Sequence, residues 1–427
     1  MKKLKRLRWM IGIVAVGTLI VSLLLNWKKV YEENKNIDSD KKVIQLKMWY
    51  PWSGKEDIFQ SPFLDAVEEF NADQNEIHVE VEGFGREIYR EMLPLSIASN
   101  DTPDIYYCYT GGYLKNIVYA DKILPINEYF DESVYDKIDK NSLSAMTVDN
   151  KLYGLSFKEN VGVFLVNNEL FRKYDLDVPH TWQEFLNVSE EFMECGITPL
   201  VCSNEKSKGY TMYLEAINLY TSGIEECTNL LSQDSLENIM NSEGSKRYNQ
   251  LVKNGILGNK KESRREAEQE FYLSKIPMYY AESDIIGSII KNNCPLYGKV
   301  SIIPFPIDNG FQEELLGGVT ETFVISKNTK YPNEAVKAME KITEKFSHNI
   351  SKQGAGISTW VNEKEEAKDD LYIQVKEIIK NAEKMPYWEV YLEGKDASEY
   401  LNMAAENFLQ SAHKNCLLYT SPSPRDS

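Results

Sequence analysis

The chain has 427 residues, of which 42% are apolar, and a formal net charge of −17 at pH 7. This length predicts two or three domains with sizeable cores. The acidic balance argues against a nucleic-acid partner, because phosphates require basic surfaces. The six cysteines and four histidines show no zinc-ligand or HExxH spacing, so we expect neither a metal nor a cofactor.

The first 29 residues form a predicted signal or membrane anchor. They contain seven basic and no acidic residues, and residues 10–25 are an apolar run. This pattern predicts a secretory signal or a single membrane helix with its basic end inside. Large residues follow the run where a cleavage site would need small ones, so an uncleaved anchor is favoured over a cleaved signal. Residues 30–41, charged and without an apolar period, predict a spacer.

Strand and helix patterns alternate from residue 43 onward. Residues 43–49, 77–81 and 104–107 predict three strands. The two helices between them are predicted to bury two apolar stripes, Phe63, Ala66, Val67 and Phe70 in the first, and Ile88, Met92 and Leu95 in the second. This order predicts a parallel sheet with right-handed crossovers.

Residues 151–200 are the most informative stretch. They combine a strand containing Tyr153-Gly154, an apolar strand that ends at Asn167-Asn168, and a helix that begins after Thr181. Thr181 and Glu184 form a predicted capping box for that helix. In this order the segment resembles the middle of the extracellular solute-binding proteins of sugar ABC transporters, the group that contains the maltodextrin-binding proteins.

The resemblance extends more weakly from about residue 42 to about residue 409. It implies an α/β fold of the two-lobed periplasmic-binding-protein type (type II-like), with a hinge and a ligand cleft between the lobes. We expect residues 42–156 and 304–346 in the first lobe, and residues 157–303 and 347–414 in the second lobe. A later helix is predicted to bury Ala335, Val336, Met339 and Ile342.

Candidate ligand-binding residues follow strand ends, because binding loops lie at the carboxyl ends of strands in such sheets. Sugars are bound by aromatic faces together with carboxylates and amides that bond the hydroxyls. On these grounds, and on the resemblance for the last two tryptophans, the expected ligand-binding residues are Trp49, Trp52, Ser53, Phe84, Tyr109, Thr110, Lys158, Asn160, Glu282, Asp284, Thr320, Glu321, Trp360 and Trp388.

Several of these residues have an alternative structural interpretation. Trp52 is either a stacking platform for a sugar or a tryptophan packed in a loop, and packing also accounts for Trp360 and Trp388. Many relatives carry a tryptophan near the position of Asp284, and this chain lacks it. That difference favours a ligand held more by hydrogen bonds to carboxylates than by stacking.

We expect a binding protein and not an enzyme, because the chain has no GxSxG, P-loop or GxGxxG motif. The resemblance implies the substrate-binding component of an ABC importer, a monomer at the outer face of a Gram-positive cell membrane. It would bind a sugar or oligosaccharide by hinge closure and deliver it to two permease subunits with a cytoplasmic ATPase. The alternative is a membrane-tethered sugar sensor coupled to a signalling kinase.

The end of the chain is treated separately. Residues 415–427 are rich in Ser and Pro and resemble the translation of sequencing-adapter read-through, which predicts a non-native tail. A disordered natural tail is the alternative.

Overall fold

A computed structural model describes most of the chain between residues 43 and 419. The described ranges are 43–54, 57–204, 209–232, 237–261, 263–291, 294–308, 313–361, 369–392 and 394–419. The predicted anchor and spacer lie outside them. Within these ranges, no helix combines the length and the apolar character that a membrane crossing requires.

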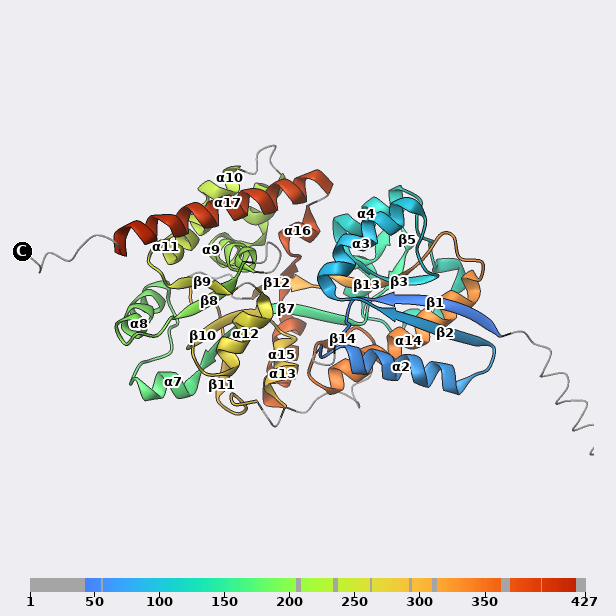
Figure 1. The fold of residues 1–427 in the computed structure, drawn as a ribbon, viewed down its shortest axis with the longest axis horizontal. Helices are drawn as coiled ribbons and strands as arrows, with labels where there is room; N and C mark the ends of the chain where they lie inside the picture. Colours follow the sequence, from blue (N-terminus) through green and yellow to red (C-terminus); the bar gives the residue numbers. More distant parts are fainter. Residues whose placement is uncertain are drawn as a thin grey trace, which may run out of the picture.

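The described residues form two α/β lobes connected by a long strand (Figure 1). The first lobe contains one large apolar cluster, built from residues between Leu46 and Phe157 and between Phe323 and Trp360. The second lobe contains two clusters, which lie among residues 161–316 and 371–408 and include Ile357. The two-lobed α/β fold predicted from the sequence is therefore confirmed.

The first lobe is built on a five-stranded sheet in the order β2-β1-β3-β13-β6. Strand β1 pairs in parallel with β2 and β3, as expected, whereas β13 runs antiparallel to β3 and β6. The elements of this lobe are β1 (Ile44–Tyr50), α2 (Gln60–Asp73), β2 (Ile77–Gly83), α3 (Arg86–Ser99), β3 (Ile105–Tyr109), α4 (Gly111–Tyr119), η1 (Asn127–Tyr129), α5 (Glu132–Tyr135), α6 (Lys140–Ala145), β4 (Thr147–Val148), β5 (Lys151–Leu152), β6 (Gly154–Leu155), β13 (Glu321–Ile325) and α14 (Pro332–Lys352).

Two predicted helix faces of this lobe are confirmed and one is wrong. All four stripe residues of α2 and all four of α14 are buried. On α3, however, Ile88 and Leu95 are 64% and 72% exposed, and Tyr89, Leu93 and Ile97 are buried instead. On the observed face, the hydroxyl of Tyr89 donates to the carbonyl of Tyr107 at 2.6 Å. The large side chain of Tyr89 is therefore buried with its hydroxyl hydrogen-bonded.

The second lobe is built around strand β7, which pairs antiparallel with β10, β11, β12 and β14. Its elements are β7 (Lys158–Asn167), α7 (Asn168–Lys173), α8 (Trp182–Glu194), β8 (Leu200–Ser203), α9 (Tyr210–Ser232), α10 (Glu237–Asn241), α11 (Glu243–Lys253), β9 (Leu257–Lys261), α12 (Arg264–Tyr272), β10 (Met278–Glu282), α13 (Ile285–Ile289), β11 (Val300–Ile303), β12 (Glu314–Gly318), β14 (Ile357–Ser358), α15 (Asp370–Asn381), β15 (Glu383–Met385), α16 (Trp388–Tyr391) and α17 (Gly394–Tyr419). The capping box of Thr181 and Glu184 is present at the start of α8.

The packing places the chain crossings differently from the expected boundaries. Phe305 and Leu316 belong to a core cluster of the second lobe, although both follow residue 304. Ile350 and Trp360 belong to the core of the first lobe, although both follow residue 347. The reason is that β12 completes the sheet around β7, while α14 continues along the first lobe to Lys352. We therefore propose crossings near residues 158 and 319, and a third around β14 and Trp360, where β14 pairs with β7 and Trp360 packs in the first lobe.

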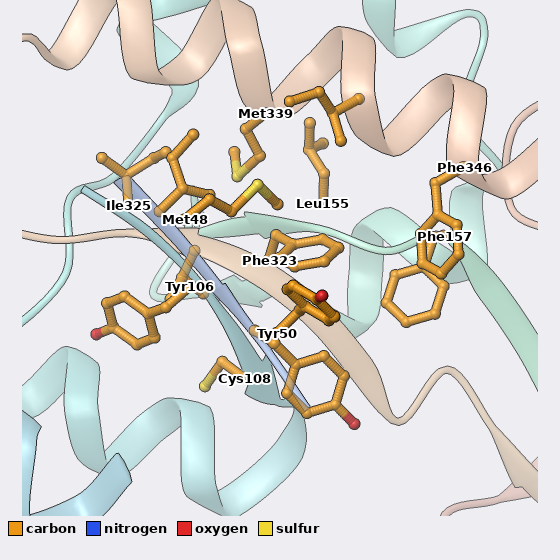
Figure 2. Packing of buried hydrophobic residues seen from close by; sticks show 14 of the residues in the cluster. Met48, Tyr50, Tyr106, Cys108, Leu155, Phe157, Phe323, Ile325, Met339 and Phe346 are labelled. Atoms are coloured by element: carbon orange, nitrogen blue, oxygen red, sulfur yellow. The ribbon is translucent and has the colours of Figure 1, made fainter. Parts of the chain in front are cut away.

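The core of the first lobe is unusually aromatic where it approaches β7. Figure 2 shows Phe157, Phe323 and Phe346 packed together beneath α14, and the ring centroids of Phe157 and Phe346 are 4.7 Å apart. Phe157, a member of this aromatic cluster, directly precedes Lys158, the first residue of β7. The chain therefore changes from apolar core to buried charge within a single peptide unit.

The last described helix includes part of the predicted tail. Helix α17 extends to Tyr419, so the expected boundary at residue 414 falls within a helix, and residues 420–427 lie outside the described part.

Candidate functional site

Buried polar side chains gather where the two lobes meet. They come from the ends of strands in both sheets: Thr110 follows β3, Lys158 and Asn160 begin β7, Glu282, Ser283 and Asp284 end β10 or follow it, and Thr320 and Glu321 lie at the start of β13. Each of these eight side chains belongs to a residue that is at most 6% exposed. We call this group the polar junction.

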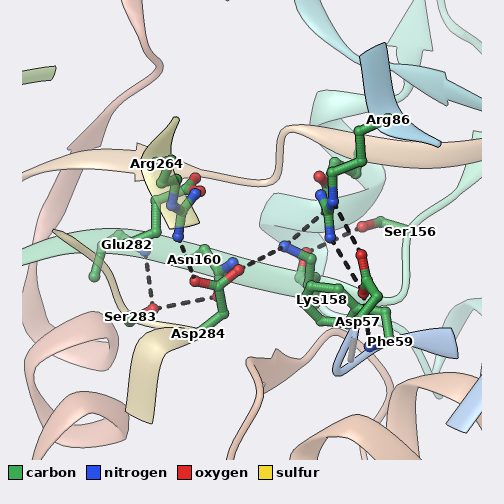
Figure 3. A network of polar contacts seen from close by, with 12 residues as sticks. Asp57, Phe59, Arg86, Ser156, Lys158, Asn160, Arg264, Glu282, Ser283 and Asp284 are labelled. Atoms are coloured by element: carbon green, nitrogen blue, oxygen red, sulfur yellow. Dashed lines mark hydrogen bonds and ion pairs between the residues drawn. The ribbon is translucent and has the colours of Figure 1, made fainter. Parts of the chain in front are cut away.

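Lys158 is the centre of the polar junction. Its Nζ lies 2.7 Å from Glu321 Oε2 and 3.8 Å from Asp284 Oδ2. Glu321 belongs to the sheet of the first lobe, and Asp284 follows a strand of the second lobe. One buried ammonium group therefore connects the two lobes through carboxylates, as Figure 3 shows for Lys158 and Asp284.

A second cation, Arg264, continues the network into the second lobe. Its guanidinium is bonded to Glu282, to Asp284 Oδ1 at 3.1 Å and to Glu268 Oε1 at 2.7 Å. Burial raises the pKa of Glu268, and the nearby carboxylates of Asp284 and Glu282 raise it further, although the charge of Arg264 opposes the shift. Three carboxylates thus converge on one guanidinium.

Asn160 and Ser283 link the two strands that carry these charges. The Ser283 hydroxyl donates to Asn160 Oδ1 at 3.3 Å and accepts from the backbone N–H of Val161 at 3.2 Å. Asn160 is 2% exposed, and its Nδ2 has no hydrogen-bond partner among the described residues. A buried amide with unused donors indicates a place for an acceptor from outside the chain.

The first lobe contributes a further layer beside Lys158. Lys158 Nζ lies 4.9 Å from the ring centroid of Phe59, and the guanidinium of Arg86 lies 5.4 Å from the same ring. Arg86 Nε is 3.2 Å from Asp57 Oδ2, and the Arg86 side chain is 49% exposed. This pair gives the junction a partly exposed polar edge (Figure 3).

The polar predictions are the ones that the fold brings together. Lys158, Glu282, Asp284 and Glu321 lie in one network of ion pairs that includes Arg264. Asn160 is bonded to Ser283, the residue between Glu282 and Asp284. Thr110 and Thr320 lie beside it, because the N–H of Thr110 donates to the carbonyl of Thr320 at 3.1 Å. Tyr109 pairs with Glu321 in the sheet register.

Three predicted aromatic residues lie in apolar cores instead. Trp52, Trp360 and Trp388 are at most 1% exposed, the first two in the first lobe and the third in the second lobe. Trp52 is surrounded by seven aromatic rings with centroids 5.1–6.2 Å away. This placement corresponds to the packed alternative for all three, because a ring buried on both faces has no face left for a sugar.

The other predicted residues of the first lobe lie apart from the network. Trp49 belongs to β1 itself, and its indole donates to Glu82 at 3.0 Å. Phe84 packs edge-on against Trp49 at 5.4 Å, and Ser53 is exposed. No hydrogen bond, ion pair or ring contact among the described residues joins these three to Lys158.

Sequence reasoning missed Arg264, Ser283 and the Asp57–Arg86 pair. Arg264 is the first residue of α12, far along the chain from any predicted loop. Ser283 lies between the predicted residues Glu282 and Asp284. Its polar side chain at the end of an apolar strand could have indicated that it belongs to the site. Among the described residues, no group of His, Cys, Asp and Glu is arranged to hold a metal ion.

Residues 52–345 match the family model described as bacterial extracellular solute-binding protein. Two curated proteins are similar to parts of the chain. An uncharacterized ABC transporter extracellular-binding protein of Pyrococcus horikoshii is 28% identical over 35% of this chain and 34% of its own length. An osmoprotective compounds-binding protein of Synechocystis is 24% identical over 72% of this chain. The chain spans less than two thirds of both, since the second match covers 62% of that protein.

Solved structures with the same fold cover most of the chain. One, from work on xylan utilization by the thermophilic bacterium Caldanaerobius polysaccharolyticus, has a TM-score of 0.79 at 23% identity, covering 88% of this chain and 99% of that one. A chitin oligosaccharide binding protein has a TM-score of 0.73 at 19% identity, with the same coverage. RafE in complex with raffinose has a TM-score of 0.69 at 16% identity, covering 88% of this chain and 100% of that one.

Proposed function

We propose that this chain, which belongs to the bacterial extracellular solute-binding protein family, is the sugar-binding component of an ABC importer. Its ligand is a sugar or oligosaccharide, held at the polar junction between the lobes. It binds the ligand, closes around it and delivers it to a membrane permease, without forming or breaking a covalent bond.

The observation that carries this proposal is the buried polar junction itself. Burying a charged group costs free energy, and even a paired buried charge is often no more stabilising than apolar residues of similar size. A group of buried charges therefore suggests a function other than stability. Here eight polar residues, each at most 6% exposed, lie where the two sheets meet, and the donor of Asn160 has no partner in the described chain. Hydroxyl groups of a sugar both accept and donate, so they suit carboxylates and an amide side by side.

The connectivity of the lobes supports the proposed closure. Strand β7 leaves the first lobe at Lys158 and becomes the central strand of the second sheet. Domains joined by a few crossing strands can close as a hinge. A ligand that contacts both lobes binds the closed state better than the open one and therefore shifts the population toward it.

The proposed ligand class is supported by the relatives. The neighbours named above are described with xylan, chitin oligosaccharide and raffinose. At identities of 23% or less they share the fold, and the choice of ligand in this chain depends on its own residues. The proposed site contains carboxylates and an amide, with no tryptophan exposed beside them among the described residues.

We also propose the partners and location that the sequence suggested. These are two permease subunits with a cytoplasmic ATPase, at the outer face of the membrane, with residues 10–25 as tether. The sensor alternative rests on the same apolar run, because no cysteine for a lipid anchor follows it before Cys108. Co-purification with permease subunits supports import, and co-purification with a kinase supports sensing.

Thermal unfolding tests the binding function directly. The full chain, purified in mild detergent, is melted with xylo-, chito- and raffinose-type oligosaccharides, with amino acids as controls. A ligand present at one hundred times its dissociation constant adds about 2.7 kcal/mol to the folded state. We expect one sugar class to raise the melting temperature, whereas a cooperative melt that no sugar shifts would reject the proposal.

A further inference from the structure

We infer that the polar junction selects ligands by charge: it accepts neutral or cationic sugars and rejects acidic ones such as uronic-acid oligosaccharides. This inference rests on the proposed sugar-binding function and adds to it a class of substrate. It follows from the number, burial and arrangement of the ionisable side chains at the junction.

The connected network holds more carboxylates than cations. Its ion pairs join Glu321, Asp284, Glu282 and Glu268 to the two cations Lys158 and Arg264. With all six of these described side chains ionised, their net charge is −2, and the adjacent Asp57–Arg86 pair adds none. The described residues thus place an excess of negative charge where a ligand would bind.

Burial makes this excess effective. The side chains of Lys158, Glu321, Glu282 and Asp284 are between 3% and 9% exposed, so water screens their charges weakly. The neighbouring carboxylates also disfavour further negative charge: after burial, those of Asp284 and Glu282 help to raise the pKa of Glu268. After burial, the carboxylate of Glu282 is likewise the leading cause that raises the pKa of Tyr387.

Asn160 gives independent evidence that a ligand meets this network. Its amide is 98% buried and lies beside Ser283, Asp284 and Lys158 in Figure 3. Its Oδ1 is bonded to Ser283, while its Nδ2 has no partner among the described residues. The unused donors require an acceptor, and a sugar hydroxyl supplies one without adding charge.

The two cations of the network cannot readily serve an anionic ligand, and Arg86 at the edge of the junction is already paired with Asp57. Arg264 already shares its guanidinium among three carboxylates, and Lys158 lies between Glu321 and Asp284. A ligand carboxylate would have to displace one of these side chains and leave it buried without a counter-ion, which is strongly unfavourable. A ligand ammonium group meets the opposite situation, because it reduces the net charge.

Four trisaccharides, two neutral and two charged, test the inference with the full chain. Xylotriose and chitotriose are neutral, the glucosamine trimer is cationic, and trigalacturonate is anionic at pH 7. We expect stabilisation by a neutral or cationic trimer, and affinity for trigalacturonate at least about tenfold lower. Affinity for a cationic trimer should fall as salt increases, whereas affinity for a neutral one should not change.

Each outcome of this panel has a separate meaning. Binding of trigalacturonate as tight as that of the best neutral trimer would overturn the charge selection and leave the sugar-binding function intact. Stabilisation by none of the trimers, nor by the oligosaccharides used to test the proposed function, would reject the proposed function itself, and the charge selection would fall with it.

A charge variant locates the selectivity. Lys158→Met retains the aliphatic length and removes the charge, so we expect the preference for the glucosamine trimer over its neutral N-acetylated counterpart, chitotriose, to increase about tenfold. Lys299→Met is the matched control, because Lys299 forms an exposed pair with Glu169 in the same lobe. An equal change in both variants, or no change in the first, would contradict the inference.

A second variant serves if Lys158→Met does not fold. Glu321→Gln removes one negative charge and keeps the shape of the side chain, so binding of trigalacturonate should become stronger relative to a neutral trimer. Unchanged relative affinity in a folded Glu321→Gln protein would also overturn the inference.

Discussion

The aromatic cluster around Trp52 and the polar junction around Lys158 lie side by side and are built on opposite principles. Phe157, in the aromatic cluster, directly precedes Lys158, and Phe59 contacts both Trp52 and Lys158. The aromatic cluster consists of packed apolar rings, whereas the junction consists of buried charged and amide side chains from both lobes. We interpret the aromatic cluster as the part that stabilises the first lobe, and the polar junction as the part that binds a ligand.

The largest expected effect comes from Trp52→Ala. Removing a fully buried tryptophan leaves a cavity among seven rings, and such changes cost about 3–5 kcal/mol of unfolding free energy. Chemical denaturation measures this loss. Trp49→Ala, at the partly buried outer face of β1, is the control and should cost less. A Trp52→Ala protein that unfolds like the wild type but binds sugar weakly would restore Trp52 as a ligand platform.

Glu282→Gln probes the junction. Glu282 is 3% exposed and bonded to Arg264, and hydrogen bonds to charged groups contribute about 1.5–3 kcal/mol. We expect the affinity for sugar, measured by calorimetry, to fall by this amount. Glu169→Gln, which removes the same charge from an exposed pair, should leave affinity unchanged. If Glu282→Gln lowered only the melting temperature, the junction would be structural, like the aromatic cluster.

Gly111→Ala tests a contact between the lobes outside the junction. A Cβ at Gly111 would overlap the carbonyl oxygen of Val390, which lies in α16 of the second lobe. The backbone φ of +63° adds strain of about 1–2 kcal/mol. Affinity for the ligand should therefore fall, because the lobes can no longer approach each other at Gly111 and Val390.

Gly196→Ala separates strain from contact. Gly196 has a φ of +76° and no atom within 4 Å of the position of a Cβ, so its replacement produces strain alone. We expect lower stability with unchanged affinity. Equal affinity losses in both glycine variants would show that contact with Val390 does not control closure.

The smallest effect concerns pH. Burial raises the pKa of Glu159, although Lys384 at 2.9 Å opposes the shift. A carboxylate whose folded-state pKa is raised binds its proton more tightly in the folded state, so its contribution to stability is present at low pH. That contribution is lost as pH rises from the unfolded pKa through the folded pKa.

Denaturation at pH 4 and pH 7 measures this dependence. The unfolding free energy of the wild type, relative to that of Glu159→Gln, should decrease between the two pH values. A relative increase would mean that the ion pair with Lys384 dominates over burial.

Much of the fold and part of the candidate site could be predicted from the sequence. The polar candidates Lys158, Asn160, Glu282, Asp284 and Glu321 were found because they follow recognisable strand patterns. The tryptophans were harder, since the same residue type serves both for stacking on a sugar and for filling a core. Arg264 could not be found, because nothing near it in sequence indicates which charges it meets.

The amino-acid sequence by itself determined the local features: the buried faces of α2 and α14, the capping box at Thr181 and the apolar strand that ends at Asn167. These depend on periodicity and hydrogen bonds within a few residues. Only the tertiary structure decided which face of α3 is buried and that Trp52 lies in a core. It also brought Lys158, Asp284 and Glu321 together, because distant strand ends become neighbours only when both sheets are assembled.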